Sequence, residues 1–142
     1  MYFTLLPENY VLLDEDSLDS CLVPILKTLF IKNNSNNDDT FIQLHLSSDE
    51  VSIILPEKNL ANFTSIRYTP PYRAIRVDTA NPGLEEAGIL AEVTALFKSA
   101  AISILSVSTF RYNYIFIQTT DLPAFIQLIN KNKDTVHFED TS

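Results

Sequence analysis

Along the first half of the chain, segments in which apolar residues have the spacing of a strand alternate with segments in which they have the spacing of a helix. Apolar residues that recur every three or four positions predict a helix, and strict alternation predicts a strand with one buried face. These patterns predict a strand at residues 10–13 and a helix at 18–30. Two strands joined by a tight turn follow at 41–47 and 51–55. A short helix or turn at 56–62 and a short return strand at 64–68 complete the first half. On the second strand Ile42, Leu44 and Leu46 share one face.

The second half repeats this order of elements. Its most regular pattern is an amphipathic helix with apolar positions at Ala87, Leu90, Val93, Leu96 and Phe97. A strand over residues 72–78 precedes this helix, and a hairpin over 102–109 and 112–118 follows it. The last helix has Asp121 as its predicted cap and Pro123 in its first turn, and a strand over 136–138 ends the series.

The two halves therefore share one arrangement. Tyr10 and Tyr72 open them, and Ser47 and Ser108 end their second strands at nearly the same offset. An internal repeat of this kind predicts an α+β fold of two tandem ferredoxin-like βαββαβ units, at residues 1–69 and 70–142. Each unit should be an antiparallel sheet with its helices on one face.

The charge balance narrows the range of functions. The chain has 10 Lys and Arg against 18 Asp and Glu, a net charge of −8, so it offers no basic surface for nucleic acid. No apolar run approaches the roughly 20 residues of a membrane-spanning helix, and the N-terminal segment lacks the features of a signal peptide. We therefore expect a cytoplasmic protein that binds neither nucleic acid nor membrane.

Few residues offer catalytic or metal-binding chemistry. The two histidines, His45 and His137, have no further ligand residue at the spacing that metals require. Cys21 lies in the apolar stripe of a predicted helix, which favours a core position over a nucleophile. Gly83 and Gly88 are the only glycines, so there is no glycine-rich phosphate loop. We expect no metal, no cofactor and no catalytic residue.

Two segments around the most regular helix carry a family resemblance. Residues 78–84 (DTANPGL) lead into the helix, residues 89–93 (ILAEV) lie within it, and residues 101–104 (AISI) follow it. An acidic strand end, a Pro-Gly turn, an amphipathic helix and small residues before Ile-Ser-Ile resemble the ACT domain. Together with YRAIRV at 72–77 and DEVSII at 49–54, the chain resembles the tandem ACT proteins related to the CASTOR arginine sensors, whose small bacterial and fungal relatives have about this length.

This resemblance implies a small effector, mostly an amino acid, bound at an interface between ACT units. It implies contacts from the loop after the first strand and from the second strand of a neighbouring unit, which here are Asn81, Pro82, Gly83, Leu84, Ile102, Ser103 and Ile104. Gly83 would allow close approach to the backbone, and N–H groups at the helix start would hold a carboxylate. The alternative is that Asn81-Pro82-Gly83 only turns the chain into a helix.

The hairpin departs from the resemblance at two positions. The close relatives carry aspartates where this chain has Arg111 and Asn113. An aspartate there would pair with a ligand ammonium group, whereas Asn113 accepts a hydrogen bond without a charge. We count Asn113 among the candidate ligand residues on this ground.

The strand over residues 112–118 has apolar or aromatic side chains on both faces. If Ile115 and Ile117 face the helices, Tyr112, Tyr114 and Phe116 form an exposed aromatic patch unless something covers it. Packing against the other unit or a second copy is the favoured explanation. A stacked ligand and an unrelated partner are the alternatives.

Two functional hypotheses follow. The first is a non-catalytic regulatory sensor of a small effector, an amino acid by the resemblance, acting as a homodimer and leaving room for a regulatory protein partner. The second is a structural or protein-interaction dimer that uses Tyr112, Tyr114 and Phe116 and binds no small molecule. An enzyme of unknown type is a third hypothesis, which no set of residues favours.

Overall fold

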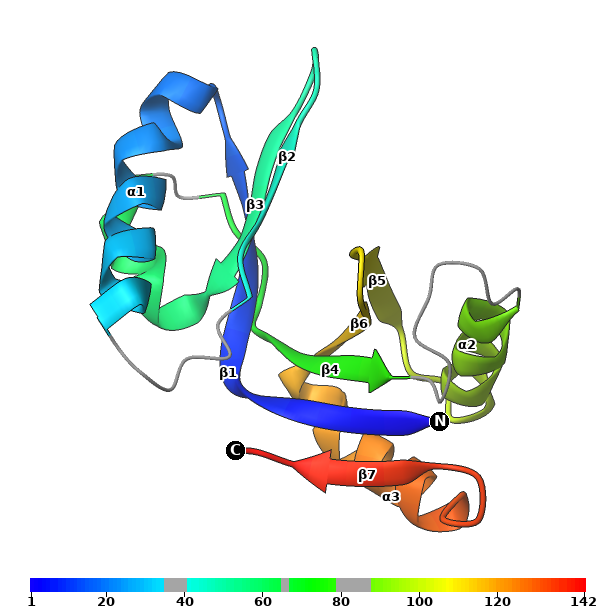
Figure 1. Cartoon of the computed structure of the whole chain (residues 1–142). Coiled ribbons are helices and arrows are strands. Elements are labelled where there is room, and N and C mark those ends of the chain that lie inside the picture. Colours follow the sequence, from blue (N-terminus) through cyan, green and yellow to red (C-terminus); the bar gives the residue numbers. More distant parts are fainter. Residues whose placement is uncertain (35–40, 65–66, 79–87) are drawn as a thin grey trace. The chain divides into compact units, whose positions relative to one another are not determined.

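The structure is a computed structural model, and it describes residues 1–34, 41–64, 67–78 and 88–142 (Figure 1). These residues form two compact units. Unit 1 joins Met1–Pro7 to Tyr72–Ser142, and unit 2 is Glu8–Pro71. The predicted division between residues 69 and 70 assigned the first seven residues to the N-terminal unit, whereas the structure assigns them to the C-terminal one.

The sheet of unit 1 has the strand order β7-β1-β4-β6-β5. The bounds of these strands are β1 Tyr2–Glu15, β4 Tyr72–Asp78, β5 Ile104–Ser108, β6 Asn113–Gln118 and β7 His137–Asp140. Residues 2–7 of β1 belong to unit 1, where β1 runs parallel to β7. β6 is antiparallel to both β4 and β5. Residues 2–7 were not predicted as a strand, although Phe3 and Leu5 alternate there and are buried.

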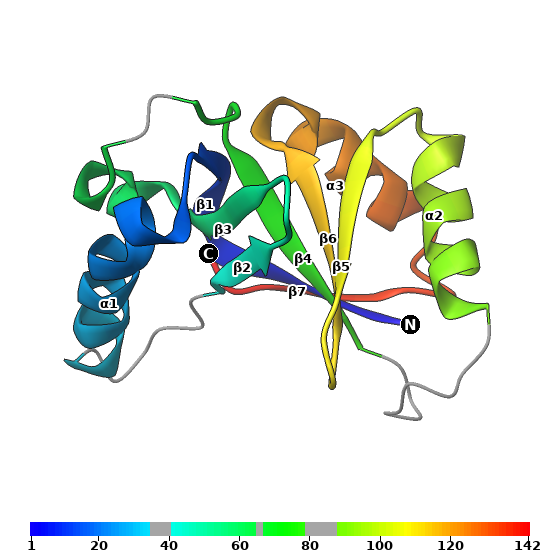
Figure 2. The same cartoon turned by 90° about the horizontal axis from the view of Figure 1, so that it is seen from above.

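Two α-helices, α2 (Ile89–Ser99) and α3 (Leu122–Lys131), contact each other and share one core with the sheet of unit 1 (Figure 2). Val93 and Phe97 of the predicted stripe are fully buried, whereas Leu90 is 38% exposed. Ala87 lies outside the described residues. The strand faces agree with the alternation, because Ile75, Val77, Ile115 and Ile117 all enter this core.

Aromatic rings run through the core of unit 1. Phe97 and Phe125 stack with ring centroids 5.8 Å apart, and Phe3 lies 6.2 Å from Phe97. Phe138 makes an edge contact with Phe125 at 5.6 Å. Phe3 comes from β1 and Phe138 from β7, so both of these strands contribute rings that pack against α2 and α3. This packing explains why the first residues belong to unit 1.

The start of α3 differs from the prediction. Asp121 stands at the N-cap position, but its side chain makes no capping hydrogen bond. The cause is the 3₁₀-helix η2 (Thr119–Asp121), which leads directly into α3 and gives Asp121 a helical backbone with φ −90° and ψ −3°. A capping side chain needs an extended backbone to reach the first N–H groups. Pro123 does lie in the first turn, as predicted.

Unit 2 contains residues 8–15 of β1, α1 (Leu18–Asn34), β2 (Gln43–Leu46), β3 (Val51–Pro56) and the 3₁₀-helix η1 (Glu57–Asn62). Its strands are antiparallel in the order β2-β3-β1. The predicted return strand is represented among the described residues by a bridge between Leu13 and Tyr68. β2 lies at the edge of this sheet, and Leu44 and Leu46, which were expected to share one face of the strand, are 42% and 55% exposed.

Both units are built from a strand, a helix, a hairpin and a second helical segment. In unit 1 the series β4-α2-β5-β6-α3-β7 is a complete βαββαβ motif, to which β1 adds a strand. In unit 2, β1, α1, β2, β3 and η1 follow the same order. The predicted α+β fold of tandem ferredoxin-like units is confirmed.

The core of unit 1 leads to a stability prediction. Phe97→Ala removes a fully buried ring that contacts Phe3 and Phe125, so the free energy of unfolding of unit 1 should fall by about 3–5 kcal/mol. Leu90→Ala, on the same helix but partly exposed, should cost less than about 1 kcal/mol. Urea denaturation of both variants tests this, and equal losses would contradict the proposed core.

Candidate functional site

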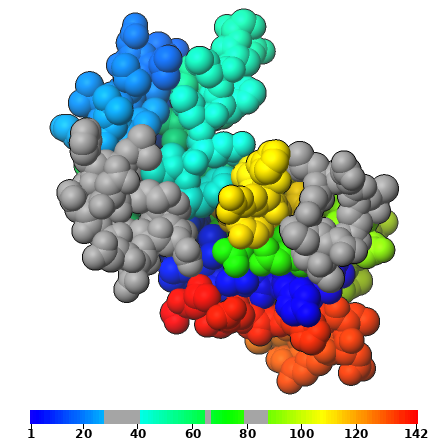
Figure 3. Space-filling view, in the orientation of Figure 1, coloured from blue at the N-terminus to red at the C-terminus, as the bar shows by residue number. Residues whose placement is uncertain are grey.

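A pocket of about 360 Å³ lies in unit 1, where the start of α2 meets the β5–β6 hairpin. It is lined by Gly88, Ile89, Leu90, Ala91, Ser108, Thr109, Phe110, Arg111, Tyr112 and Asn113. β5 and the turn after it reach the surface in the space-filling view, where they are yellow (Figure 3). The volume is at the lower end of the range for sites that bind small molecules.

The hairpin wall of the pocket is a tight turn. The Thr109 backbone N–H donates to the Tyr112 carbonyl oxygen at 2.8 Å, and the Tyr112 N–H donates to the Thr109 hydroxyl at 3.2 Å. These bonds fix Phe110 and Arg111 at the tip, where Phe110 is 84% exposed and Arg111 is also exposed. The turn therefore presents an aromatic ring and a cation beside the pocket.

Just below the tip, a side-chain hydrogen bond joins the two strands. The Ser108 hydroxyl donates to Asn113 Oδ1 at 2.6 Å. Ser108 and Asn113 are register partners, so both side chains lie on the same face of the sheet. Because the amide oxygen is used in this bond, the amide NH₂ group of Asn113 is left to donate elsewhere.

Tyr112 is held from the other side by a charged pair. The Arg76 guanidinium lies 4.6 Å from the centroid of the Tyr112 ring, and Arg76 Nε is 3.2 Å from Asp78 Oδ2. Tyr114 contacts the Tyr112 ring edge-on at 6.2 Å. Stacking on Arg76 and the contact with Tyr114 together fix the orientation of the tyrosine ring.

The opposite wall is the start of α2. Gly88 precedes the helix with φ +89°, a left-handed conformation that glycine adopts at little cost. As a glycine it provides no capping side chain, and the Glu92 N–H makes the first helical bond to the Gly88 carbonyl. The N–H groups before Glu92 therefore point toward the pocket end of the helix without a side-chain cap.

A second groove, of about 610 Å³, runs between α2 and the start of β5. Ile102, Ser103 and Ile104 line it together with Lys98 and four small residues of α2 and the turn after it, Ala91, Thr94, Ala95 and Ala101. The predicted ligand residues are thus divided, because Asn113 lines the first pocket and Ile102–Ile104 line the second, with Ala91 common to both. Asn81, Pro82, Gly83 and Leu84 lie outside the described residues.

Several pocket residues escaped the sequence analysis. The sequence pattern placed Gly88 only as the second glycine and Arg111 only as a departure from a resemblance, and it assigned Phe110 no role in a site. The signals available were a glycine directly before a regular helix and an aromatic and a basic residue between two strands. Neither shows that the two segments meet, since they are about 20 residues apart and are joined only by the tertiary fold.

The predicted aromatic patch is smaller than expected. Phe116 is fully buried at 0% exposure, while Tyr112 and Tyr114 are half-buried. Phe116 therefore contributes no exposed surface to a partner. Tyr112 instead lines the pocket of unit 1, and its role as an interface residue stays a prediction.

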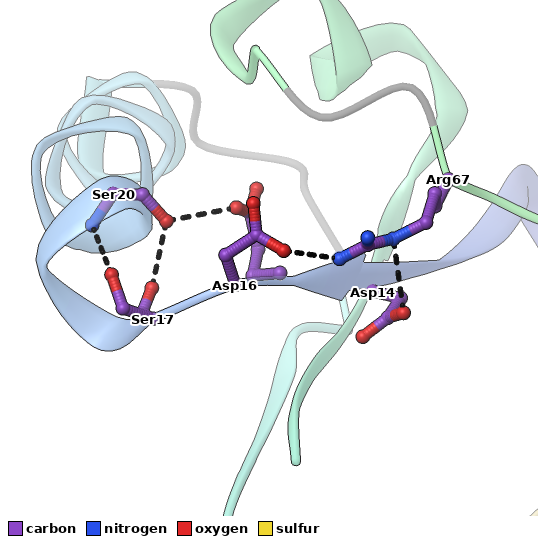
Figure 4. Close-up of polar contacts among 6 residues, drawn as sticks. Asp14, Asp16, Ser17, Ser20 and Arg67 are labelled. Carbon is purple, nitrogen blue, oxygen red and sulfur yellow. Dashed lines mark hydrogen bonds and ion pairs between the residues drawn. The ribbon is translucent and has the colours of Figure 1, made fainter.

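The acidic run of unit 2 forms a second polar cluster (Figure 4). Arg67 Nε lies 3.1 Å from Asp14 Oδ2, and Arg67 Nη2 lies 2.5 Å from Asp16 Oδ1. The hydrogen bond to Asp16 raises the pKa of the Arg67 guanidinium. Between these aspartates Glu15 turns inward and is 6% exposed, and its Oε2 accepts a 3.0 Å hydrogen bond from Ser20. The cluster joins the end of β1 to the start of α1 and to the return segment.

Cys21 is a core residue of unit 2. Its side chain is fully buried, and Sγ lies 3.3 Å from the Leu18 carbonyl oxygen that accepts its hydrogen bond. Burial raises the pKa of the thiol, and the negative charge of Glu15 raises it further.

Across the described ranges, no three His, Cys, Asp or Glu side chains come together as metal ligands would. The helices in those ranges are also too short or too polar to cross a membrane.

The Cys21 environment generates a prediction about reactivity and pH. In the native protein a thiol-specific disulfide reagent should modify Cys21 at least about tenfold more slowly than in the urea-unfolded chain, because reaction requires opening of the core. A Cys21→Ala control should show no reaction, and equal modification rates in the folded and unfolded states would contradict burial.

The same environment predicts a pH dependence of stability. Since the folded pKa of Cys21 is raised, the thiol stabilises the fold below its ordinary pKa, and this contribution is lost as the pH rises through the folded value.

Comparisons with known proteins bear on the fold. Residues 67–131, from shortly before β4 to the end of α3, match the ACT domain. No curated protein matches the chain. Protein Atu0741 of Agrobacterium tumefaciens has a similar structure, with a TM-score of 0.70 and 15% sequence identity over 99% of this chain and 93% of that one.

Two further structures share the fold at similar identity. Protein VC0802 of Vibrio cholerae, described as of unknown function and a possible transport protein, has a TM-score of 0.63 and 16% identity over 89% of this chain and 84% of that one. The regulatory subunit of aspartate kinase from Thermus thermophilus has a TM-score of 0.54 and 11% identity over 89% and 93%. At such identities the likeness concerns the fold alone. Residues 67–131 thus match the ACT domain, and the chain has a fold similar to that of an aspartate kinase regulatory subunit.

Proposed function

We propose that the chain is a non-catalytic regulatory module whose unit 1 binds a small effector of the amino-acid class in the pocket between α2 and the β5–β6 hairpin. The pocket itself carries this proposal. The described residues that line it all fall within the segment that matches the ACT domain. The fold likeness to a protein named as a regulatory subunit supports a regulatory rather than a catalytic role. We place this activity in the cytoplasm.

The chemistry of the pocket supports binding without catalysis. Among the lining residues that the structure describes, Arg111 is the only charged side chain, and there is no histidine, cysteine or carboxylate. General acid–base or nucleophilic catalysis requires a titratable side chain close to the reacting atoms. The pocket instead offers hydrogen-bond donors and hydroxyl groups from the start of α2 and from the hairpin, which suit recognition of a polar molecule.

A separate observation favours a homodimer. Within the part of the chain that the structure describes, β5 lies at the edge of the sheet of unit 1 and pairs with β6 alone. Its five residues, ILSVS, include no charge, no proline and no glycine. Uncharged edge strands tend to pair with another strand unless something blocks them. We propose that β5 pairs with β5 of a second copy, which would also bring two copies of Ile104 and Ser106 close together.

The ligand hypothesis predicts the effect of filling the pocket. In a thermal-melt screen against the twenty amino acids, at least one should raise the midpoint, since a ligand at a hundred times its Kd stabilises by about 2.7 kcal/mol. Ala91→Phe places a large ring on the exposed face of α2 at the pocket and should weaken that ligand at least about tenfold by calorimetry.

The matched control is Ala95→Phe, one helical turn further along the same face. Ala95 lines only the second groove, so this variant should bind the ligand like the wild type. A flat screen, or equal loss of binding in both variants, would contradict the proposed site.

The dimer hypothesis predicts a change of mass. Ser106→Lys introduces a charge at the centre of β5, where the side chain is exposed, and should convert a dimer to a monomer in light scattering after size exclusion. Ser99→Lys, at the end of α2, is the control and should leave the mass unchanged. A dimer that persists in Ser106→Lys, or a monomeric wild-type protein, would rule out this edge.

A further inference from the structure

We propose that the pocket of unit 1 selects a small dicarboxylate, with Arg111 and the side-chain amide of Asn113 binding one carboxylate. The inference rests on the proposed function and adds the charge of the ligand to it. The proposed ligand class includes acidic amino acids and dicarboxylates without an amino group, because both have two carboxylate groups.

The described lining of the pocket is positively charged within an acidic protein. The chain has a net charge of −8, yet the lining residues that the structure describes hold one guanidinium and no carboxylate. At physiological ionic strength charges further away than about 8 Å are largely screened, so the nearest groups decide which ligand charge is favoured. An ammonium or guanidinium group of a ligand would meet Arg111 and find no acid to pair with among these described lining residues.

Arg111 is available to a ligand, whereas the neighbouring Arg76 is not. Arg76 is paired with Asp78 at 3.2 Å and stacked on Tyr112 at 4.6 Å, and both side chains of the pair are about three-quarters buried. Arg111 sits in the exposed tip of the hairpin and makes no ion pair with any residue of the described ranges. The planar guanidinium of an arginine matches a carboxylate with two parallel hydrogen bonds.

The orientation of Asn113 points to the same ligand charge. Its Oδ1 accepts the 2.6 Å hydrogen bond from Ser108, so the group that remains is the NH₂ donor. A donor binds a carboxylate oxygen but repels an ammonium group, which can only donate. Arg111 and Asn113 are two residues apart on the same hairpin and both line the pocket, so they form one donor wall.

The opposite wall adds donors of another kind. The residues from Gly88 to Ala91 line the pocket, and Gly88 supplies no side chain to cap the helix. Their N–H groups lie at the positive end of the helix dipole and complement a second negative group. Donor walls on both sides distinguish a dicarboxylate from a monocarboxylate, because each end of the ligand then meets hydrogen-bond donors.

Calorimetric titration of the whole chain tests the inference with five probes: succinate, 2-oxoglutarate, L-glutamate, L-lysine and L-arginine. The wild type should bind at least one dicarboxylate more tightly than it binds lysine or arginine. Arg111→Gln and Asn113→Asp should each weaken that dicarboxylate about ten- to a hundredfold, the range for a charge-assisted hydrogen bond. Asn113→Asp keeps the size of the side chain and an acceptor for Ser108, so it tests charge rather than packing.

Lys133→Gln is the matched control, since it changes the net charge equally but lies after α3, away from the pocket. It should bind like the wild type.

Tighter binding of lysine or arginine, or equal weakening by Lys133→Gln and Arg111→Gln, would overturn the charge assignment while leaving the pocket as a ligand site. Binding of uncharged amino acids alone would overturn it in the same way, and a protein that binds none of the amino acids or dicarboxylates would overturn the proposed function as well. Glutamate tighter than succinate supports an acidic amino acid, and equal binding supports the shared dicarboxylate chemistry.

Discussion

Four phenylalanine rings pack in succession through the core of unit 1, from Phe3 to Phe97, Phe125 and Phe138. Two come from the strands near the chain termini and two from the helices that cover the sheet. Burying each such side chain contributes about 1.5–3 kcal/mol relative to leaving it exposed. Without residues 2–7 and 137–140, the stacked pair Phe97 and Phe125 would lose the contacts with Phe3 and Phe138. The position of α2, and with it one wall of the pocket, depends on this packing.

The pocket combines an ordered framework with a short exposed tip. β6 is bonded to β4 on one side and β5 on the other, and three of its residues are fully buried. The turn that projects from this framework is closed by its own hydrogen bonds, and Arg76 steadies the tyrosine beside it. Binding residues are often carried on loops that a rigid scaffold positions. Here the sheet sets the distance between the hairpin and α2, and the turn provides the side chains that line the pocket.

The two units use acidic residues differently. In unit 2 Asp14 and Asp16 both form ion pairs with Arg67, and Glu15 accepts a hydrogen bond from Ser20. The acidic run there connects a strand to a helix. In unit 1 the described lining residues of the pocket include one guanidinium and no carboxylate. Such a lining is the basis for proposing that the pocket binds an anion. The repeated order of elements therefore carries different chemistry in its two copies.

Local periodicity determined much of the fold. The strand over residues 72–78, the buried faces of Ile75 and Ile115, and the proline-started last helix follow from patterns within a few residues, because period and turn chemistry act locally. The ACT resemblance of the second half also lay in the sequence. Three features depended on contacts distant in sequence: the pairing of β1 with β7, the complete burial of Phe116 and the exposure of Leu44 and Leu46.

The same division holds for the site. The sequence showed that Asn113 and Arg111 stand at the hairpin, but only the tertiary structure brought them opposite Gly88 and directed the amide NH₂ of Asn113 away from its bond to Ser108. It also separated Asn113 from Ile102–Ile104 into different cavities. Residue types and element order are local properties that the sequence determines by itself. Which side chains share a cavity was decided by the tertiary structure, because it depends on how the helices pack against the sheet.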